Sequence, residues 1–411
     1  MKKDFLVTFI TEFCVILCVL ATYKLADSFF GQKGFTDYSI VRRVIAMIQP
    51  VFLIGMHITI PRQIAFYVNE SRQKSSEIFL SAVIILFSIS LFTSLVLLLF
   101  KKQFAILLFD NISYVKFITP LMLMLAGMTF HSAVYGYYRG MGLMNKANLM
   151  QIIMLGVIPL LSIYSAAGVA PFLVITGVLW IIFSLIFLLT IIIGLKFSFS
   201  SVIKNIRSTL GHGIQRFPAD LGIAALLSMP VVFFTHAFGT TESGYLAFSI
   251  SLLSMTGAAL KPIGLVMLPH ATLLVATKQY SELNSKIKKM IVYFLLLSAV
   301  VIIGYELLSP VLLSVFLGRT GTELVFISRI VMAAAAGYMF YVFFRSIIDA
   351  ADYRSYNTVN ILISLSILLI LSLPGVFMNV NRVYLLSIFV LSVFTLGILT
   401  YFQIKKIISR T

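Results

Sequence analysis

The chain has 411 residues, of which 60% are hydrophobic and only 11% are charged, and its mean hydropathy is +1.05. So little charge cannot cover the surface of a soluble protein of this length. The net charge of +17 does not indicate nucleic-acid binding either, because the basic residues lie in short segments between apolar runs and form no soluble basic face.

Apolar runs of membrane-spanning length recur along the whole chain. A run of about 20 apolar residues crosses a bilayer as a helix, because its backbone groups must be bonded within the segment. We therefore predict an all-α polytopic membrane protein with about twelve transmembrane helices. The predicted spans are 5–26, 38–62, 77–99, 117–137, 147–168, 172–194, 214–236, 244–269, 290–316, 324–346, 356–376 and 382–404.

The second half of the chain repeats features of the first half at a shift of 208 residues. Gly31 corresponds to Gly239, and Pro61 corresponds to Pro269. A chain that repeats itself at half its length is predicted to form two similar lobes, and in membrane transporters the site lies between such lobes. The predicted organisation is an N-lobe at 1–195, a cytoplasmic amphipathic linker at 196–213 and a C-lobe at 214–411, with the two pseudo-symmetric six-helix lobes around a central cavity.

The distribution of basic residues predicts the orientation of the spans. If the N-terminus is cytoplasmic, 20 of the 31 Lys and Arg residues lie on the inner side and six on the outer side. Basic loops stay on the cytoplasmic side of a membrane. We therefore expect a multi-pass protein of the cell inner membrane with both termini in the cytoplasm, and two fused lobes favour a monomer.

Glycine and proline mark corresponding places in the two halves. Gly31 and Gly239 allow tight outer turns between long helices. Prolines weaken or close the second and eighth spans, and bends there would suit alternating access. Such residues are also ordinary in membrane helices, so both interpretations stay open. The candidate hinge and turn residues are Gly31, Pro50, Pro61, Gly239, Pro262 and Pro269.

The span layout and several short motifs resemble the MOP (multidrug/oligosaccharidyl-lipid/polysaccharide) exporter superfamily, and within it the Wzx-type flippases of O-antigen and related polysaccharide repeat units. The motifs are Phe30-Gly31-Gln-Lys-Gly34-Phe35-Thr-Asp-Tyr38, Ile60-Pro61-Arg62, Arg139-Gly140-x-Gly142, Phe238-Gly239 with Gly244-Tyr245, and Leu268-Pro269. The resemblance implies a MATE-like fold and transport of a lipid-linked oligosaccharide across the membrane. It also makes membrane lipids and other polysaccharide assembly proteins candidate partners.

Basic residues inside spans are the candidate substrate contacts, because an ionisable group at mid-bilayer costs on the order of 3 kcal/mol. Lys261 lies nine residues before His270, about 13 Å along a helix from the predicted inner end, and precedes Pro262. We interpret Lys261 either as a contact for the pyrophosphate of an undecaprenyl-linked sugar or as a paired structural lysine.

Five further cations complete the candidate set. Arg42 and Arg43 open the second span, and because neighbours on a helix point about 100° apart they cannot both face the cavity centre. Arg216 begins the seventh span, where it either meets substrate or anchors the helix. Lys24 lies near the outer end of the first span and Arg329 lies in the tenth.

Three acidic residues inside spans are candidates for ion coupling. Glu12 and Asp220 each lie about two turns from the cytoplasmic end of the first helix of their lobe. A carboxylate in a low dielectric can take up H⁺ or Na⁺. Asp220 could instead pair with Arg216, its i,i+4 neighbour. Glu306 in the ninth span is the third candidate.

Two other functional classes, an antiporter and a membrane enzyme, make different demands on the sequence from a flippase. A MATE-like cation-coupled multidrug or metabolite antiporter predicts acidic cavity walls, which the basic excess within the spans disfavours. A membrane enzyme would need a large outer loop, and the outer loops are short, so no enzyme activity is expected. The two cysteines and five histidines show no metal-ligand spacing, so neither a metal nor another cofactor is predicted.

Overall fold

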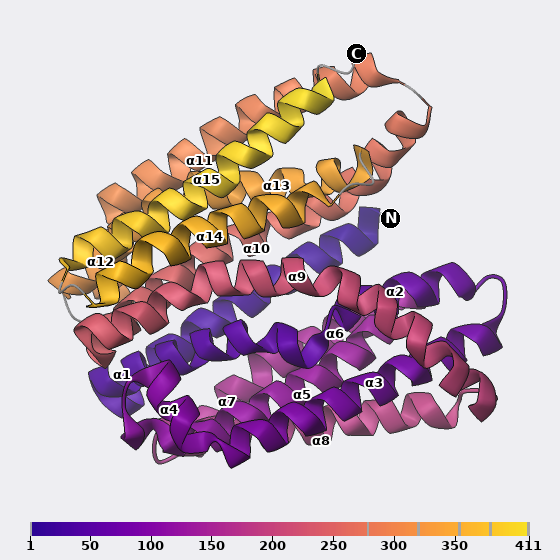
Figure 1. Ribbon diagram of the computed structural model, residues 1–411, viewed down its shortest axis with the longest axis horizontal. Helices are drawn as coiled ribbons and strands as arrows, with labels where there is room; N and C mark the ends of the chain where they lie inside the picture. The colour runs from indigo at the N-terminus through magenta and orange to yellow at the C-terminus, as the bar shows by residue number, and fades with distance from the viewer. Residues whose placement is uncertain (1, 278, 319–320, 352–354, 378–379, 409–411) are drawn as a thin grey trace. The chain divides into compact units, whose positions relative to one another are not determined.

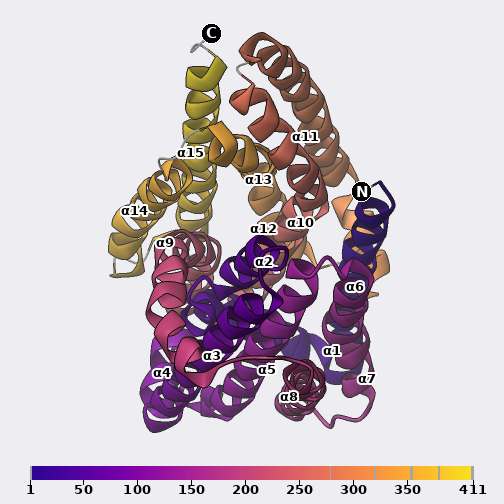
Figure 2. The ribbon, with the colours of Figure 1, turned by 90° about the vertical axis from the view of Figure 1, so that its right-hand side faces the viewer.

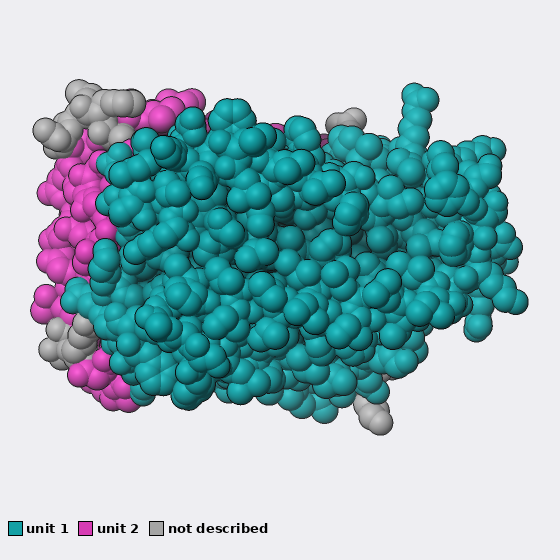
Figure 3. Space-filling model, turned by 90° about the horizontal axis from the view of Figure 1, so that it is seen from below, with its two compact units in different colours: residues 1–224 teal, residues 225–411 magenta. Residues whose placement is uncertain are grey.

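The computed structural model describes residues 2–277, 279–318, 321–351, 355–377 and 380–408 (Figure 1). It leaves undescribed the side chains of residues 2–5, 261–273, 275, 276, 280, 350, 351, 376, 377 and 408. Within the described residues every element is a helix, as the composition predicts. The chain forms two compact units, Met1–Ala224 (unit 1) and Ala225–Thr411 (unit 2), which Figure 3 colours separately.

Unit 1 holds the helices of the first half and the beginning of α9. They are α1 (Lys2–Leu53), α2 (Met56–Tyr67), α3 (Arg72–Leu99), α4 (Lys101–Phe109), η1 (Ile112–Tyr114), α5 (Val115–Gly140), α6 (Met144–Ile152), η2 (Ile153–Val157), α7 (Ile158–Tyr164), α8 (Val169–Ile193) and the first part of α9 (Phe199–Phe238). Helix α5 packs against α1, α2, α3 and α8 and forms the centre of this unit (Figure 2).

Unit 2 holds the remainder of α9 and six more helices. They are α10 (Thr240–Ala276), α11 (Tyr280–Leu317), α12 (Thr322–Ala333), α13 (Ala335–Ala351), α14 (Tyr356–Phe377) and α15 (Arg382–Ile408). Helix α10 packs against α12 and α13, and α15 packs against α13 and α14. Helix α11 instead presents large apolar side chains outward: Val300, Leu307 and Val315 are 68%, 72% and 71% exposed.

The helix count agrees with the predicted architecture. Ten helices of the described residues are long and apolar enough to cross a membrane, and the pair α12 and α13, bent by 43° at Ala334, raises the number to eleven. Helix α1 is counted once among these, although it consists of two arms that meet at the non-helical Gly31. The protein is thus a multi-pass helical membrane protein with about the predicted twelve spans.

Two glycines that the repeat relates to each other adopt backbone conformations that other residues avoid. Gly31 has φ 69° between the arms of α1, and Gly239 has φ 81° between α9 and α10. Nothing lies within 4 Å of a Cβ atom built on either residue. The positive φ angle, and not crowding, is therefore the reason that glycine suits these two turns.

The second predicted span is broken between α1 and α2. Ile54 and Gly55 have φ 37° and 69°, and Pro50 lies one turn earlier. Helix α9 crosses the break so closely that a Cβ atom on Gly213 would lie 2.4 Å from the carbonyl oxygen of Ile54. The break is thus held by backbone packing within unit 1.

The fifth predicted span, 147–168, is less regular than the sequence suggested, because the π-helical segment η2 separates α6 from α7. Pro159 has no N–H with which to bond the carbonyl of Leu155, which disturbs the helix at this point. The indole N–H of Trp180 on α8 donates to the carbonyl oxygen of Met154 over 2.5 Å and satisfies one group of this segment.

Candidate functional site

Two hydrogen bonds between side chains join α1 to α6 in unit 1. Asn148 Nδ2 donates to Thr8 Oγ1 over 3.2 Å, and Gln151 Nε2 donates to Glu12 Oε1 over 2.9 Å. Glu12 lies one turn after Thr8, and Gln151 one turn after Asn148, so the two bonds lie one above the other along the helix pair. We call these four residues the polar seam.

Glu12 is the predicted coupling residue whose described hydrogen-bond partner is a side-chain amide. Within the described residues no cationic group lies within 4 Å of its carboxylate, and Gln151 is 9% exposed. The amide of a glutamine donates to a carboxyl oxygen whether or not that carboxyl carries a proton. The polar seam can therefore hold Glu12 in either protonation state.

A second cluster surrounds Arg42 on the other arm of α1. Arg42 Nη1 donates to Tyr38 Oη over 3.0 Å, and the Arg42 guanidinium lies 5.5 Å from the centre of the Tyr23 ring. The two tyrosine rings are 5.0 Å apart, and their side chains are buried. We call Arg42, Tyr23 and Tyr38 the arginine–tyrosine cluster. This cluster and the polar seam both belong to unit 1, and about 16 Å of α1 separates Glu12 from Tyr23.

The arginine–tyrosine cluster does not neutralise its own charge. Among the described residues no carboxylate lies within 4 Å of the half-buried Arg42, and the nearby Asp37 is bonded to Tyr114 of η1. About 16 Å of helix separates Arg42 from the turn at Gly31, so Arg42 lies deeper in the span than the predicted start at residue 38 implied. A cation inside a span needs a polar or charged partner, and an anionic ligand would supply one.

The other predicted cations of unit 1 differ in their burial. Arg43 is 7% exposed and, as the next residue of the helix, lies about 100° around the axis from Arg42. Lys24 is exposed on the first arm of α1. Arg216 is half-buried on α9, where it packs beside Gly55.

Asp220 does not form the pair that the sequence suggested. The described ion pair of Asp220 is with His57 of α2, at 3.8 Å between Oδ1 and Nε2, and not with Arg216. The i,i+4 spacing was outweighed because the break at Gly55 brings α2 against α9. His57 was overlooked, although a histidine within the predicted span 38–62 is itself an ionisable residue in the membrane.

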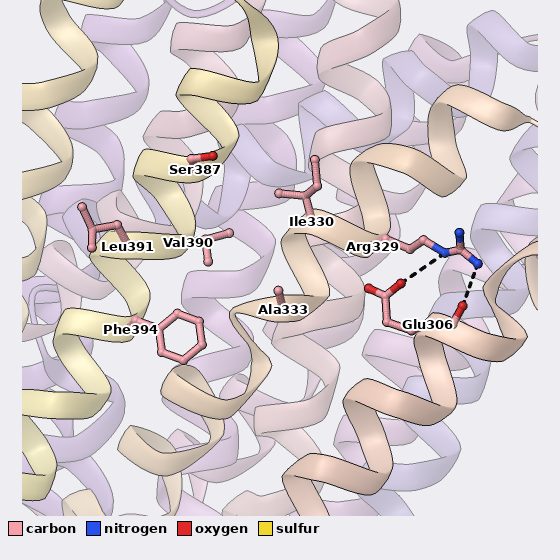
Figure 4. A pocket seen from close by; sticks show the side chains of 8 residues that line it. All are labelled: Glu306, Arg329, Ile330, Ala333, Ser387, Val390, Leu391 and Phe394. Carbon is pink, nitrogen blue, oxygen red and sulfur yellow. Dashed lines mark hydrogen bonds and ion pairs between the residues drawn. The ribbon is translucent and has the colours of Figure 1, made fainter.

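Glu306 and Arg329, predicted for separate roles, contact each other in unit 2 (Figure 4). Arg329 Nε lies 3.3 Å from Glu306 Oε2 and donates to Ser309 Oγ over 2.9 Å. Arg329 Nη2 also donates to the backbone carbonyl of Glu306 over 2.6 Å. The pair therefore joins α11 to α12 and cancels two charges inside the membrane-spanning region.

Lys261, the strongest candidate from the sequence, has a side chain outside the described residues. Lys261, Pro262 and Pro269 belong to α10, but their side chains lie outside the described residues, so their roles stay predictions. Gln151, Asn148 and Tyr23 were not among the candidates from the sequence. Asn148 and Gln151 carried a usable signal, because two amides three residues apart in an apolar span share one face. Tyr23 carried none, since tyrosine is common in membrane helices.

Comparison with known proteins places the fold. No family model and no curated protein sequence matches this chain. An inward-facing multidrug resistance MATE family transporter of the MOP superfamily superposes with a TM-score of 0.77 at 12% identity, over 98% of this chain and 99% of that one. The fold is MATE-like.

Two further solved structures extend this likeness. The eukaryotic MATE transporter AtDTX14 has a TM-score of 0.72 at 12% identity, covering 100% of this chain and 98% of its own. The lipid II flippase MurJ, in an inward closed conformation, has a TM-score of 0.64 at 15% identity, covering 98% and 88%. At identities this low, the likeness shows the fold alone, and the substrate has to be inferred from the residues of this chain.

Proposed function

We propose that this chain is a transporter that moves undecaprenyl-pyrophosphate-linked oligosaccharide repeat units from the cytoplasmic to the outer leaflet by alternating access, as a Wzx-type flippase. The observation that carries the proposal is Arg42, a half-buried guanidinium on a membrane-spanning arm whose described partners are neutral tyrosines. A pyrophosphate would supply anionic acceptor oxygens to Arg42, which has no carboxylate within 4 Å among the described residues. The fold also occurs in a lipid II flippase, which supports a lipid-linked substrate.

In this proposal the residues of unit 1 divide the work between substrate and driving ion. Arg42 contacts the pyrophosphate, and Tyr38 and Tyr23 hold the guanidinium in place. Lys261, Arg43, Lys24 and Arg216 remain proposed contacts along the path, whereas Arg329 is already paired. Glu12 takes up H⁺ or Na⁺, because it is the candidate carboxylate held by a neutral amide. No step requires covalent chemistry, and we propose a monomer in the cell inner membrane with cytoplasmic termini.

A MATE-like cation-coupled antiporter is the second candidate. The observation that favours it is the carboxylate of Glu12, which could bind a cationic substrate directly. It differs from the flippase in the sign of charge that it transports. A transport assay that offers both kinds of substrate therefore distinguishes the two functions.

The test uses purified protein in liposomes and a fluorescent polyprenyl-pyrophosphate disaccharide whose exposure on each leaflet is read with an impermeant quencher. We expect Arg42→Gln to lower the initial flipping rate about tenfold, the effect of one lost charge-assisted hydrogen bond. Arg42→Lys keeps the charge without the planar fork and should retain an intermediate rate. Arg62→Gln, at an exposed position of α2, is the matched control.

Equal yields and equal thermal midpoints for Arg42→Gln and Arg62→Gln would show that a difference in their flipping rates comes from transport and not from misfolding. If Arg42→Gln flips the substrate as fast as Arg62→Gln does, Arg42 is not the anion contact. If the liposomes instead accumulate a lipophilic cationic dye, and Glu12→Gln abolishes that uptake, the antiporter replaces the flippase as the function.

A further inference from the structure

A pocket of about 640 Å³ lies within unit 2 between α11, α12 and α15 (Figure 4). Glu306 and Arg329 stand at one side, and Val390, Leu391 and Phe394 of α15 form the opposite wall. Binding sites for small molecules usually measure about 300–1,000 Å³ and combine apolar walls with a few polar groups. The pocket has both properties, and the function proposed above makes no use of it.

The side chains beside the pocket face outward and are apolar. Leu307 and Leu308 directly follow Glu306 and are 72% and 53% exposed, and Leu391 in the opposite wall is 52% exposed. Exposed leucines on membrane-spanning helices are suited to contact with lipid chains, which are as apolar as they are. A ligand that reaches this pocket through the bilayer must therefore be an amphiphile or an apolar molecule.

The charge of the pocket argues for an uncharged polar group on that ligand. Glu306 and Arg329 cancel each other, and the remaining lining residues carry no charge. An anionic group would have to compete with Glu306 for Arg329, and a cationic group would have to compete with Arg329 for Glu306. A neutral group leaves this ion pair intact.

The ion pair offers such a group one donor and one acceptor. Arg329 uses Nε and Nη2 for its bonds to Ser309 and Glu306, and within the described residues no hydrogen bond is found for Nη1. Glu306 Oε1 likewise has no hydrogen bond there. One hydroxyl group of a ligand can donate to Oε1, and another hydroxyl group of the same head can accept from Nη1.

We propose that this pocket binds a neutral amphiphile with a hydroxylated head, such as a glycolipid or an alkyl glycoside. The head hydrogen-bonds to Glu306 and Arg329, and the apolar part lies on Ile330, Ala333 and the α15 wall. The site is complete within unit 2 and requires no transport, so it stands or falls independently of the proposed flippase function.

The experiment uses the full chain in phosphatidylcholine nanodiscs and an alkyl β-glucoside with a diazirine in its alkyl chain. We expect photolabelling on peptides of α12 and α15. Octyl glucoside should suppress the label at about tenfold lower concentration than octyl sulfate or octyltrimethylammonium. The reason is that a charged head must disrupt the ion pair between Glu306 and Arg329 to bind, whereas a neutral head hydrogen-bonds to the intact pair. Equal suppression by all three competitors would overturn the proposal.

Two variants separate binding from folding. Ala333→Phe fills the pocket without touching the ion pair and should lower the label about tenfold, whereas Ala299→Phe on the exposed face of α11 should not. Glu306→Gln leaves Arg329 with a net charge, so octyl sulfate should become the best competitor. The site is refuted if Ala333→Phe is labelled like Ala299→Phe, or if Glu306→Gln keeps the original order of competitors.

Discussion

At the scale of single residues, three carboxylates that look alike in the sequence have different partners in the structure. Asp220 lies beside His57 and Glu306 beside Arg329, whereas Glu12 accepts from the neutral amide of Gln151. Glu306 loses its pairing with Arg329 when it binds a proton, and Asp220 loses its pairing with His57 whenever that histidine is protonated. The described partner of Glu12 is an amide, which bonds to the carboxyl in either protonation state, so Glu12 is the best suited of the three to exchange an ion during transport.

We expect Glu12→Gln to abolish the acceleration of transport by an imposed proton or Na⁺ gradient while leaving the protein folded. The amide has the shape of the protonated carboxyl and can still bond to Gln151, so the fold should tolerate it. The measurement is the flipping rate in liposomes with and without a gradient. Glu70→Gln, an exposed position before α3, is the matched control. An undiminished response in Glu12→Gln would assign coupling to another residue.

Sequence reasoning could mark charged residues in spans but could not pair them. It identified Arg42, Glu12, Glu306 and Arg329, because a charge in an apolar run is conspicuous. It missed the contacts of Glu12 with Gln151 and of Arg42 with Tyr23, because these partners are neutral and come from other helices or another arm. Pairing depends on rotation and register between helices, which hydropathy does not encode.

At the scale of elements, the close approach of α9 to the break between α1 and α2 leads to a stability prediction. A Cβ atom on Gly213 would lie 2.4 Å from the Ile54 carbonyl oxygen. Since this contact is with backbone, α9 would have to move away. We expect Gly213→Ala to destabilise the protein by about 1–3 kcal/mol, the usual cost of overpacking, measured as a lower thermal midpoint in detergent.

Gly211→Ala is the matched control for this prediction. It lies on the same helix two residues earlier, and a Cβ atom there meets nothing within 4 Å. Because alanine favours helix over glycine by about 1 kcal/mol, this control should leave the midpoint unchanged or raise it. A midpoint for Gly213→Ala at or above that of Gly211→Ala would show that α9 and the break do not touch as described.

The elements themselves followed closely from sequence, with exceptions that have local causes. Apolar runs indicated helices at the predicted spans, because a bilayer fixes helix length, although the second span is broken at Ile54 and Gly55. The short helix α4, the π segment η2 and the bend at Ala334 were not foreseen. In the π segment, Trp180 of a neighbouring helix bonds to the backbone carbonyl of Met154, and a contact of this kind leaves no periodic pattern in the sequence.

At the scale of the whole molecule, the chain forms two compact units that divide after Ala224, and Gly31 and Gly239 have positive φ at turns that the repeat relates to each other. The similarity of two lobes at 1–195 and 214–411 stays a prediction. The first half of α9 belongs by its contacts to unit 1, since Val202, Gly213 and Asp220 all contact elements of that unit. Helix α9 continues without interruption from Phe199 to Phe238. Most of the predicted linker at 196–213 is therefore the beginning of α9, and polar residues such as Lys204 and Arg207 are exposed side chains of that helix.

The orientation of the molecule in the membrane is the last prediction, and unit 1 supplies the positions to test it. Lys33 lies next to the turn of α1 and Asp110 at the end of α4, and the bond of Asp37 to Tyr114 places both segments at one end of the unit (Figure 1). Lys74 and Lys146 begin α3 and α6 at the other end. All four positions are exposed.

In a background with Cys14 and Cys18 replaced by alanine, each of these positions is changed singly to cysteine. We expect an impermeant maleimide to label Lys33→Cys and Asp110→Cys in intact cells, and Lys74→Cys and Lys146→Cys only after permeabilisation. The physical reason is the excess of basic residues on the predicted inner side, which resists translocation. Each pair controls for the other, because the four sites are similarly exposed. The reverse labelling pattern would place the N-terminus outside, and would also reverse the direction in which Arg42 and Glu12 meet the two sides of the membrane.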